Sequence, residues 1–203
     1  MQHLGFFLIL FTILKLKMAS STVFLGISCG DVNGVGIEIV IKAFLDGQLL
    51  KNGTPIIYAP CAIIKYYKKI LGYSQFHYNK VTTIEEVIPN QFNVINISCE
   101  DFVVNPGEES RLSGRLALKS LDCAIYDLKH NLIDILVTLP INKKTVSFFY
   151  KNFVGHTEYL LQNFNSRQNC LMFLCSEQLK VATLTNHISI SKVADFIAPD
   201  LLR

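Results

Sequence analysis

Apolar runs of strand length alternate along this chain with stretches whose apolar residues recur at helical spacing. Near-continuous apolar runs occupy 23–28, 55–59, 93–97 and 133–138, and glycine, proline or polar residues bound each of them. Such runs are typical of strands that are buried on both faces of a parallel sheet. We therefore predict four buried strands within the first 140 residues.

The segments between these runs favour helices. In the longest of them the apolar side chains follow a helical period, which predicts an amphipathic helix over 113–130. Shorter helices are expected at 37–45 and 61–71. Because strands and helices alternate, we predict an α/β fold, a mainly parallel sheet flanked by helices.

The last part of the chain has a different pattern. The runs at 171–174 and 181–185 are close together in sequence, and we predict that they form paired strands. A further helix is expected to begin at Val193 and to run towards Leu202. Loops and polar residues gather between Pro140 and Gly155, where we place a lobe boundary.

The composition indicates a globular protein. Of the 203 residues, 50% are hydrophobic and 17% are charged, and the formal net charge is +3. This charge is too small and too scattered to indicate nucleic-acid binding. The densest basic cluster, Lys65, Lys68 and Lys69, is interpreted as the solvated face of the helix over 61–71.

Six cysteines show no CxxC pair and no metal-ligand spacing. Most lie within apolar runs, where a free cysteine acts as a small hydrophobic residue. We therefore expect reduced thiols, a reducing compartment and a cytoplasmic protein.

The first seventeen residues contain an apolar run over 4–14 that is short for a membrane span and lacks a preceding basic residue. We expect 1–17 to be a dispensable extension, with Met18 as a natural start. The rest divides into a first α/β lobe over 18–140 and the start of a second lobe over 141–203. A membrane-tethered protein that uses 4–14 as its anchor is the alternative.

A glycine-rich turn, GDVNGVG over 30–36, follows the first predicted strand. Gly34 and Gly36 would allow backbone amides to approach a phosphate at a helix N-terminus. The spacing is neither that of the dinucleotide fingerprint nor that of a P-loop. A functional loop and a tight strand-to-helix turn are therefore equal alternatives.

Two histidines lie in small polar surroundings at the edges of predicted elements. His156 stands in the segment VGHTE (154–158), and His187 ends the segment LTNH (184–187). Neutral imidazole is a common metal ligand and hydrogen-bonding group near neutral pH. These two segments are the strongest chemical signal in the chain, whereas His3, His77 and His130 are interpreted as ordinary surface histidines.

Four ordered segments together resemble the 4-hydroxythreonine-4-phosphate dehydrogenase family of pyridoxal phosphate (vitamin B6) biosynthesis. The resemblance implies a fold akin to that of the isocitrate and isopropylmalate dehydrogenases. Val32, Asn33 and Ile37 depart from the family's usual residues in the first segment. The segments are GDVNGVGIE (30–38), TLPINK (138–143), GHTEYL (155–160) and TNHISI (185–190).

The resemblance also implies roles for individual residues. His156 and Thr157 are expected to contact substrate, and His187 is expected to be the first of three metal-binding histidines. The implied cofactors are NAD and a divalent metal, which would be Zn, Mg, Co or Mn. Lys143 is expected either to supply charge to a substrate phosphate or assist proton transfer, or equally to be a solvated lysine at a helix start. A homodimer that acts on a phosphorylated small molecule is implied as well.

Three hypotheses follow. The first is NAD-dependent oxidation and decarboxylation of 4-phosphohydroxy-L-threonine to 3-amino-2-oxopropyl phosphate, with 4-phospho-D-threonate or erythronate as the alternative substrate. Because the resemblance covers only the N-terminal part of the family's pattern, the chain is expected to be C-terminally truncated. The second hypothesis is therefore a catalytically inactive fragment, and the third is the membrane-tethered protein.

Overall fold

A five-stranded parallel sheet forms the centre of the protein. The computed structural model describes residues 22–98, 103–164, 172–176, 178–185 and 188–197. The strand order is β3 (Asn79–Val81), β4 (Asn93–Ile95), β2 (Thr54–Tyr58), β1 (Phe24–Ser28) and β5 (Ile135–Thr138), and every neighbouring pair is parallel. The predicted α/β class is confirmed.

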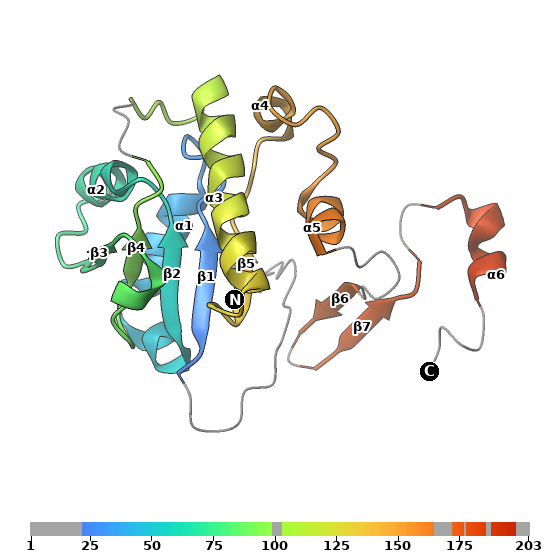
Figure 1. Ribbon diagram of the computed structural model, residues 1–203, viewed down its shortest axis with the longest axis horizontal. Coiled ribbons are helices and arrows are strands. Elements are labelled where there is room, and N and C mark those ends of the chain that lie inside the picture. The colour runs from blue at the N-terminus through green and yellow to red at the C-terminus, as the bar shows by residue number, and fades with distance from the viewer. Residues whose placement is uncertain (1–21, 99–102, 165–171, 177, 186–187, 198–203) are drawn as a thin grey trace, which may run out of the picture.

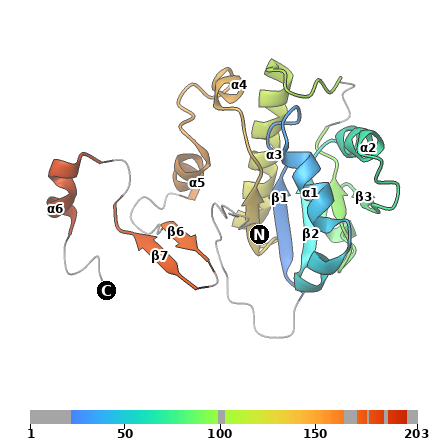
Figure 2. The same ribbon diagram turned by 180° about the vertical axis from the view of Figure 1, so that it is seen from behind.

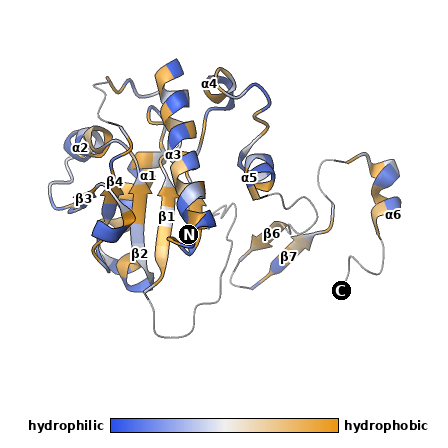
Figure 3. Ribbon diagram, in the orientation of Figure 1, coloured by the Kyte–Doolittle hydropathy of each residue, from blue (hydrophilic) through white to orange (hydrophobic). Residues whose placement is uncertain are grey.

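Helices cover both faces of the sheet (Figures 1 and 2). One face carries α1 (Gly36–Phe44) and α2 (Cys61–Ile70), and the other carries α3 (Arg111–Lys129). These helices leave the apolar strands β1 and β2 in the interior, as the hydropathy colouring indicates (Figure 3). The predicted helices at 37–45, 61–71 and 113–130 are confirmed within one or two residues.

The core is divided by the sheet into two apolar layers. Ile27 and Ile57 point towards α1 and α2, whereas Ile56 and Tyr58 point towards α3. The isoleucines are at most 2% exposed. Burial of one such side chain contributes about 1.5–3 kcal/mol, so these two layers supply most of the driving force for folding.

One described strand and two described α-helices were not predicted from the hydrophobic pattern. β3 consists of Asn79, Lys80 and Val81 and lies at the sheet edge, where one side of the strand faces solvent. The helix α4 (Lys143–Ser147) lies between Pro140 and Gly155, where loops were expected to gather, and α5 (His156–Phe164) begins directly after that region. α4 has only five residues, which is too few to display a helical period.

The C-terminal part contains the predicted paired strands. β6 (Met172–Cys175) and β7 (Lys180–Thr183) form an antiparallel hairpin, and α6 (Val193–Phe196) follows, starting at the predicted residue. Figure 1 places this hairpin beside the five-stranded sheet rather than within it. The lobe boundary between 140 and 155 stays a prediction.

The basic cluster of α2 lies as predicted on the outside of the protein. Lys65 and Lys69 are exposed and Lys68 is half-buried, as expected for the solvated face of α2.

Four described cysteines are free thiols, and burial raises the pKa of Cys29 to about 12. Within the described ranges, no helix is both long and apolar enough to cross a bilayer. The apolar run over 4–14 lies outside those ranges.

α3 and α4 approach each other closely at Gly114. A Cβ atom on Gly114 would lie 2.3 Å from the carbonyl oxygen of Thr145 and 2.4 Å from its carbonyl carbon. Real Cβ atoms do not come this close to backbone atoms, so only glycine fits here without moving α4. The position of α4 therefore depends on the absence of a side chain on α3.

Substitution Gly114→Ala should lower the free energy of unfolding by about 2 kcal/mol or more, because the added methyl group collides with a backbone that cannot rotate away. Alanine is otherwise the better helix former, by about 1 kcal/mol. Gly72→Ala is the matched control. Gly72 has φ +73° but nothing within 4 Å of the new Cβ, so only about 1 kcal/mol should be lost. Urea unfolding measures both, and equal losses would contradict the steric argument.

Candidate functional site

The loops that follow β1 and β5 meet at the carboxyl edge of the sheet. The Asp31 amide donates to the Pro140 carbonyl over 2.8 Å, and a Cβ on Gly30 would lie 2.2 Å from that same oxygen. After β1 the chain leaves towards α1, and after β5 it leaves towards α4 on the α3 side. Ligands of open α/β sheets bind at such a point, where neighbouring strands connect to opposite faces.

The glycine turn is held by its own backbone and by α2. The Gly34 amide donates to the Asp31 carbonyl over 3.0 Å, and the Tyr67 hydroxyl donates to the Val32 carbonyl over 3.0 Å. Gly30 has φ +62°. The tight-turn interpretation is supported by these contacts, while a phosphate-binding role for the turn stays a prediction.

Asn33 joins the glycine turn to the segment before α3. Its side-chain amide donates to the Glu108 carbonyl over 3.0 Å, and its side-chain oxygen accepts from the Asn105 amide over 3.1 Å. The Asn33 carbonyl accepts from the Gly107 amide over 2.8 Å. Asn33 is 4% exposed, so these three bonds are largely shielded from water. This residue therefore fixes the course of 105–108.

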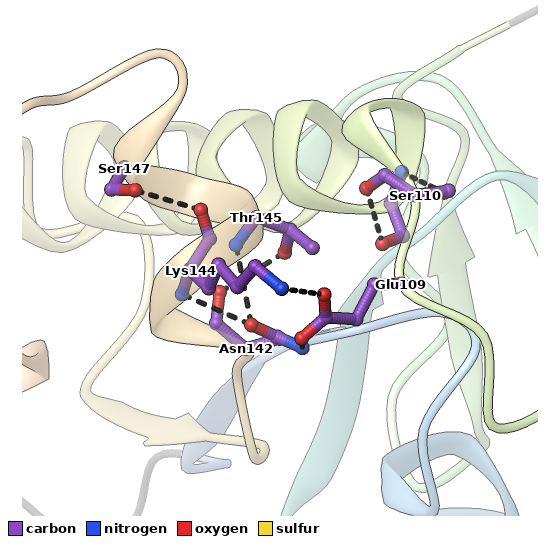
Figure 4. Close-up of polar contacts among 7 residues, drawn as sticks. Glu109, Ser110, Asn142, Lys144, Thr145 and Ser147 are labelled. Carbon is purple, nitrogen blue, oxygen red and sulfur yellow. Dashed lines mark hydrogen bonds and ion pairs between the residues drawn. The ribbon is translucent and has the colours of Figure 1, made fainter.

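The start of α4 carries the last residues of the TLPINK segment (Figure 4). Asn142 is the N-cap, and its side-chain oxygen accepts from the amides of Lys144 at 3.0 Å and Thr145 at 3.2 Å. Lys143 is the first helical residue and is exposed, so the interpretation as a lysine at a helix start fits its position. Lys144 pairs with Glu109.

Aromatic side chains hold the GHTE segment against the body of the protein. The rings of Tyr150 and Phe153 pack on Tyr159, with centroids 5.2 Å and 5.6 Å away. The Tyr159 hydroxyl donates to Asp122 on α3. Tyr159 lies on the first turns of α5, so these contacts set the orientation of the residues before it, including His156.

His156 occupies an apolar position at the first residue of α5. The Phe153 ring and its imidazole are nearly perpendicular, with centroids 6.2 Å apart. Its Nε2 atom is buried and has no hydrogen-bond partner among the described residues. Burial, and secondarily the charge of Lys143, lowers the pKa of His156 from 6.5 to about 4. The imidazole is therefore neutral at pH 7.

Lys143 and the GHTE segment are close together although they belong to different elements. A Cβ atom on Gly155 would lie 3.8 Å from the Lys143 ammonium and 3.2 Å from a carboxylate oxygen of Glu158. Three of the four motif segments, 30–38, 138–143 and 155–160, thus converge at the carboxyl edge of the sheet. Thr157 is half-buried beside His156.

The fourth segment is only partly described. Ile188 to Ile190 lie in the irregular chain and short helical turn before α6, and Ile190 is 91% exposed. The predicted metal ligand His187 lies outside the described residues. Among the residues that are described, no group of three or more His, Cys, Asp or Glu side chains gathers to hold a metal. The metal site therefore stays a prediction, and no metal step is derived.

Several residues of this region were not predicted as parts of the site. Asn33, Glu109 and Asn142 act through hydrogen bonds between segments that are 33 to 75 residues apart in sequence. A signal existed for Asn142, because asparagine before a helix is a favoured N-cap. No local pattern could reveal the other two.

Comparison with known proteins agrees with this architecture. Residues 51–203 match the family described as "Pyridoxal phosphate biosynthetic protein PdxA". A 4-hydroxythreonine-4-phosphate dehydrogenase from Bacteroides thetaiotaomicron is 34% identical over 92% of this chain. A protein from Oceanobacillus iheyensis with the provisional name D-threonate 4-phosphate dehydrogenase is 31% identical over 87% of the chain.

The crystal structure of a 4-hydroxythreonine-4-phosphate dehydrogenase from Burkholderia phymatum superposes with a TM-score of 0.80, at 24% identity, over 90% of this chain and 56% of that one. The sequence match spans 51% of the Bacteroides protein and 53% of the Oceanobacillus protein. The chain thus spans about half the length of these relatives. By its family match and its fold, this chain belongs to the PdxA family of pyridoxal phosphate biosynthetic proteins.

Proposed function

We propose that this chain binds the phosphorylated substrate in an NAD- and metal-dependent oxidation of 4-phosphohydroxy-L-threonine. The oxidised product loses carbon dioxide to give 3-amino-2-oxopropyl phosphate, a step in pyridoxal 5'-phosphate biosynthesis. Family membership supports the dehydrogenase class, and the name of the Bacteroides relative supports this substrate. A homodimer and a reducing cytoplasmic location belong to the same proposal.

The observation that carries the proposal is the buried Nε2 atom of His156, which has no hydrogen-bond partner in the described part of the chain. A buried polar atom without a hydrogen bond is unfavourable by about 1–3 kcal/mol, so a ligand group that bonds to it recovers that energy. Since the imidazole is neutral, it can accept from or donate to a substrate hydroxyl, depending on its tautomer. Thr157, the next residue of the helix, offers a hydroxyl group beside it.

Lys143 supplies the positive charge of the proposed site. Its ammonium group is exposed and lies near Gly155, so it can contact an anionic group whose other end is held by His156. A phosphate monoester carries a charge close to −2 at pH 7, which favours this pairing. In the proposal Lys143 orients the phosphate and His156 orients the hydroxyl.

NAD accepts the hydride and a divalent metal polarises the alcohol in the proposed reaction. NAD and the metal are proposed from the resemblance to the family alone. His187 is proposed as one ligand of that metal.

A second substrate is favoured by one comparison. The Oceanobacillus relative bears the name of D-threonate 4-phosphate dehydrogenase and has nearly the same identity to this chain as the Bacteroides relative. Both compounds combine a phosphate with a neighbouring hydroxyl and a carboxylate. Oxidation of 4-phospho-D-threonate or of the corresponding erythronate is therefore the alternative function, and a catalytically inactive binding fragment is the third.

The direct test measures NADH formation by the full-length gene product with each phosphorylated substrate, NAD and Zn, Mg, Co or Mn. We expect turnover of 4-phosphohydroxy-L-threonine, and we expect His156→Asn to lower kcat/KM by about a hundredfold, since it removes a buried hydrogen-bonding group at the substrate. His130→Ala is the control, because His130 is exposed at the far end of α3. Turnover of only the threonate would select the alternative, and binding without turnover would select the fragment.

His187→Ala should weaken metal binding and abolish NADH formation, because the proposed metal loses one of its ligands. Isothermal titration with Zn in the absence of substrate measures the first effect independently of turnover. If His187→Ala and His130→Ala behave alike in both measurements, the assignment of His187 is wrong.

The lowered pKa of His156 makes a prediction about stability. The unfolded chain binds a proton at His156 below pH 6.5, whereas the folded protein does so only near pH 4, so the unfolded state is favoured as the pH falls between these values. The wild type should lose about 1–2 kcal/mol more than His156→Asn between pH 7 and pH 5. Urea unfolding at both pH values measures this difference. Parallel losses in the two proteins would show that His156 titrates normally.

A further inference from the structure

Two consecutive lysines at the start of α4 have different partners. Lys144 forms an ion pair with Glu109, while Lys143 lies beside Gly155 and influences His156. Consecutive residues of a helix leave the axis about 100° apart, so the backbone at the start of α4 sets the directions from which both side chains extend. A contact that holds this backbone through Lys144 therefore also fixes the point from which Lys143 reaches towards Gly155.

Glu109 contacts two residues of the α4 start through its two carboxylate oxygens (Figure 4). One oxygen accepts from Lys144 Nζ, and the other accepts from the side-chain amide of Asn142 over 3.4 Å. Asn142 is itself the N-cap of α4. A single carboxylate thus binds both the cap and the second residue of this helix.

α4 has little intrinsic stability because it contains only five residues. Isolated helices of this length do not persist in water, so contacts with other elements must determine its geometry. Gly114 fixes its distance from α3 at Thr145, and Val146 is buried in the core. These contacts hold Thr145 and Val146, whereas Glu109 acts on Asn142 and Lys144.

Glu109 is itself well anchored. The residue before it is tied to the glycine turn through the bond from Asn33 to the Glu108 carbonyl. The residue after it, Ser110, caps α3 by accepting from the Ser113 amide over 2.9 Å. Glu109 therefore extends from a fixed backbone to the start of α4, and it links the glycine turn to the TLPINK segment.

We propose that Glu109 is a positioning residue, which holds Asn142 and Lys144 at the start of α4 and thereby presents Lys143 to the substrate site beside His156. The proposal rests on the proposed function of that site. It assigns Glu109 no contact with substrate. The Glu109 and Lys144 side chains are 49% and 69% exposed, so the pair adds little to stability and its effect is on geometry.

The test compares Glu109→Ala with Glu108→Ala in the substrate-free 203-residue chain. Glu108 is the neighbouring carboxylate, and its bonds to Asn33 and Asn105 involve only its backbone. NMR titration of the His156 imidazole reports the position of Lys143, because the lysine charge lowers the pKa of that ring. Lys143→Met defines the response to complete loss of the lysine charge.

The direction in which the pKa of His156 shifts distinguishes a positioning role of Glu109 from a direct effect of its charge. Removal of a negative charge alone would lower the pKa of His156, whereas movement of Lys143 away from the ring would raise it. We expect Glu109→Ala, like Lys143→Met, to raise the pKa of His156, by up to about half a unit. Glu108→Ala should leave this pKa unchanged. An unchanged or lowered pKa in Glu109→Ala would overturn the proposal.

A second variant and a second readout complete the test. Glu109→Gln keeps an acceptor for Asn142 but loses the ion pair, so it should give a smaller shift and replaces Glu109→Ala if that variant does not fold. In turnover assays, Glu109→Ala should raise KM for the phosphorylated substrate about fivefold with kcat within about twofold, because substrate binding is weakened. Lack of turnover by the wild type would refute the proposed function, while the imidazole titration would still decide the role of Glu109.

Discussion

The arrangement of the candidate site depends on the close approach of the β1 and β5 loops. Gly30 leaves no space for a side chain against Pro140, and the Asp31 amide bonds to the same carbonyl. This contact brings together two segments that are more than a hundred residues apart in sequence. The glycine turn, the segment before α3 and the start of α4 then hold one another through Asn33 and Glu109.

The sheet was predictable because its signal is local. β1, β2, β4 and β5 are short apolar runs, and burial of those runs is the main driving force for folding. The helices α1, α2 and α3 have apolar residues at the period of their own turn. β3 could not be predicted in the same way, because it lies at the edge and two of its three residues are polar.

The site was only partly predictable. The motif segments placed His156, Thr157 and Lys143 in one region, and the structure brings Lys143 close to the GHTE segment. The residues that support the site could not be predicted, because Asn33 and Glu109 form hydrogen bonds with residues that are distant in sequence. The lowered pKa of His156 was also hidden, since it results from burial and from a lysine on another helix.

The place of β1 in the sheet determines when the sheet can be completed during synthesis of the chain. β1 can pair with β2 once about thirty further residues have left the ribosome, but the Phe24 amide bonds to the Asp134 side chain, 110 residues later. At about 5–20 residues per second, that partner follows after roughly 5–20 s. During this interval the side of β1 that pairs with β5 has no neighbouring strand, so chaperones that bind apolar edges have their longest opportunity there.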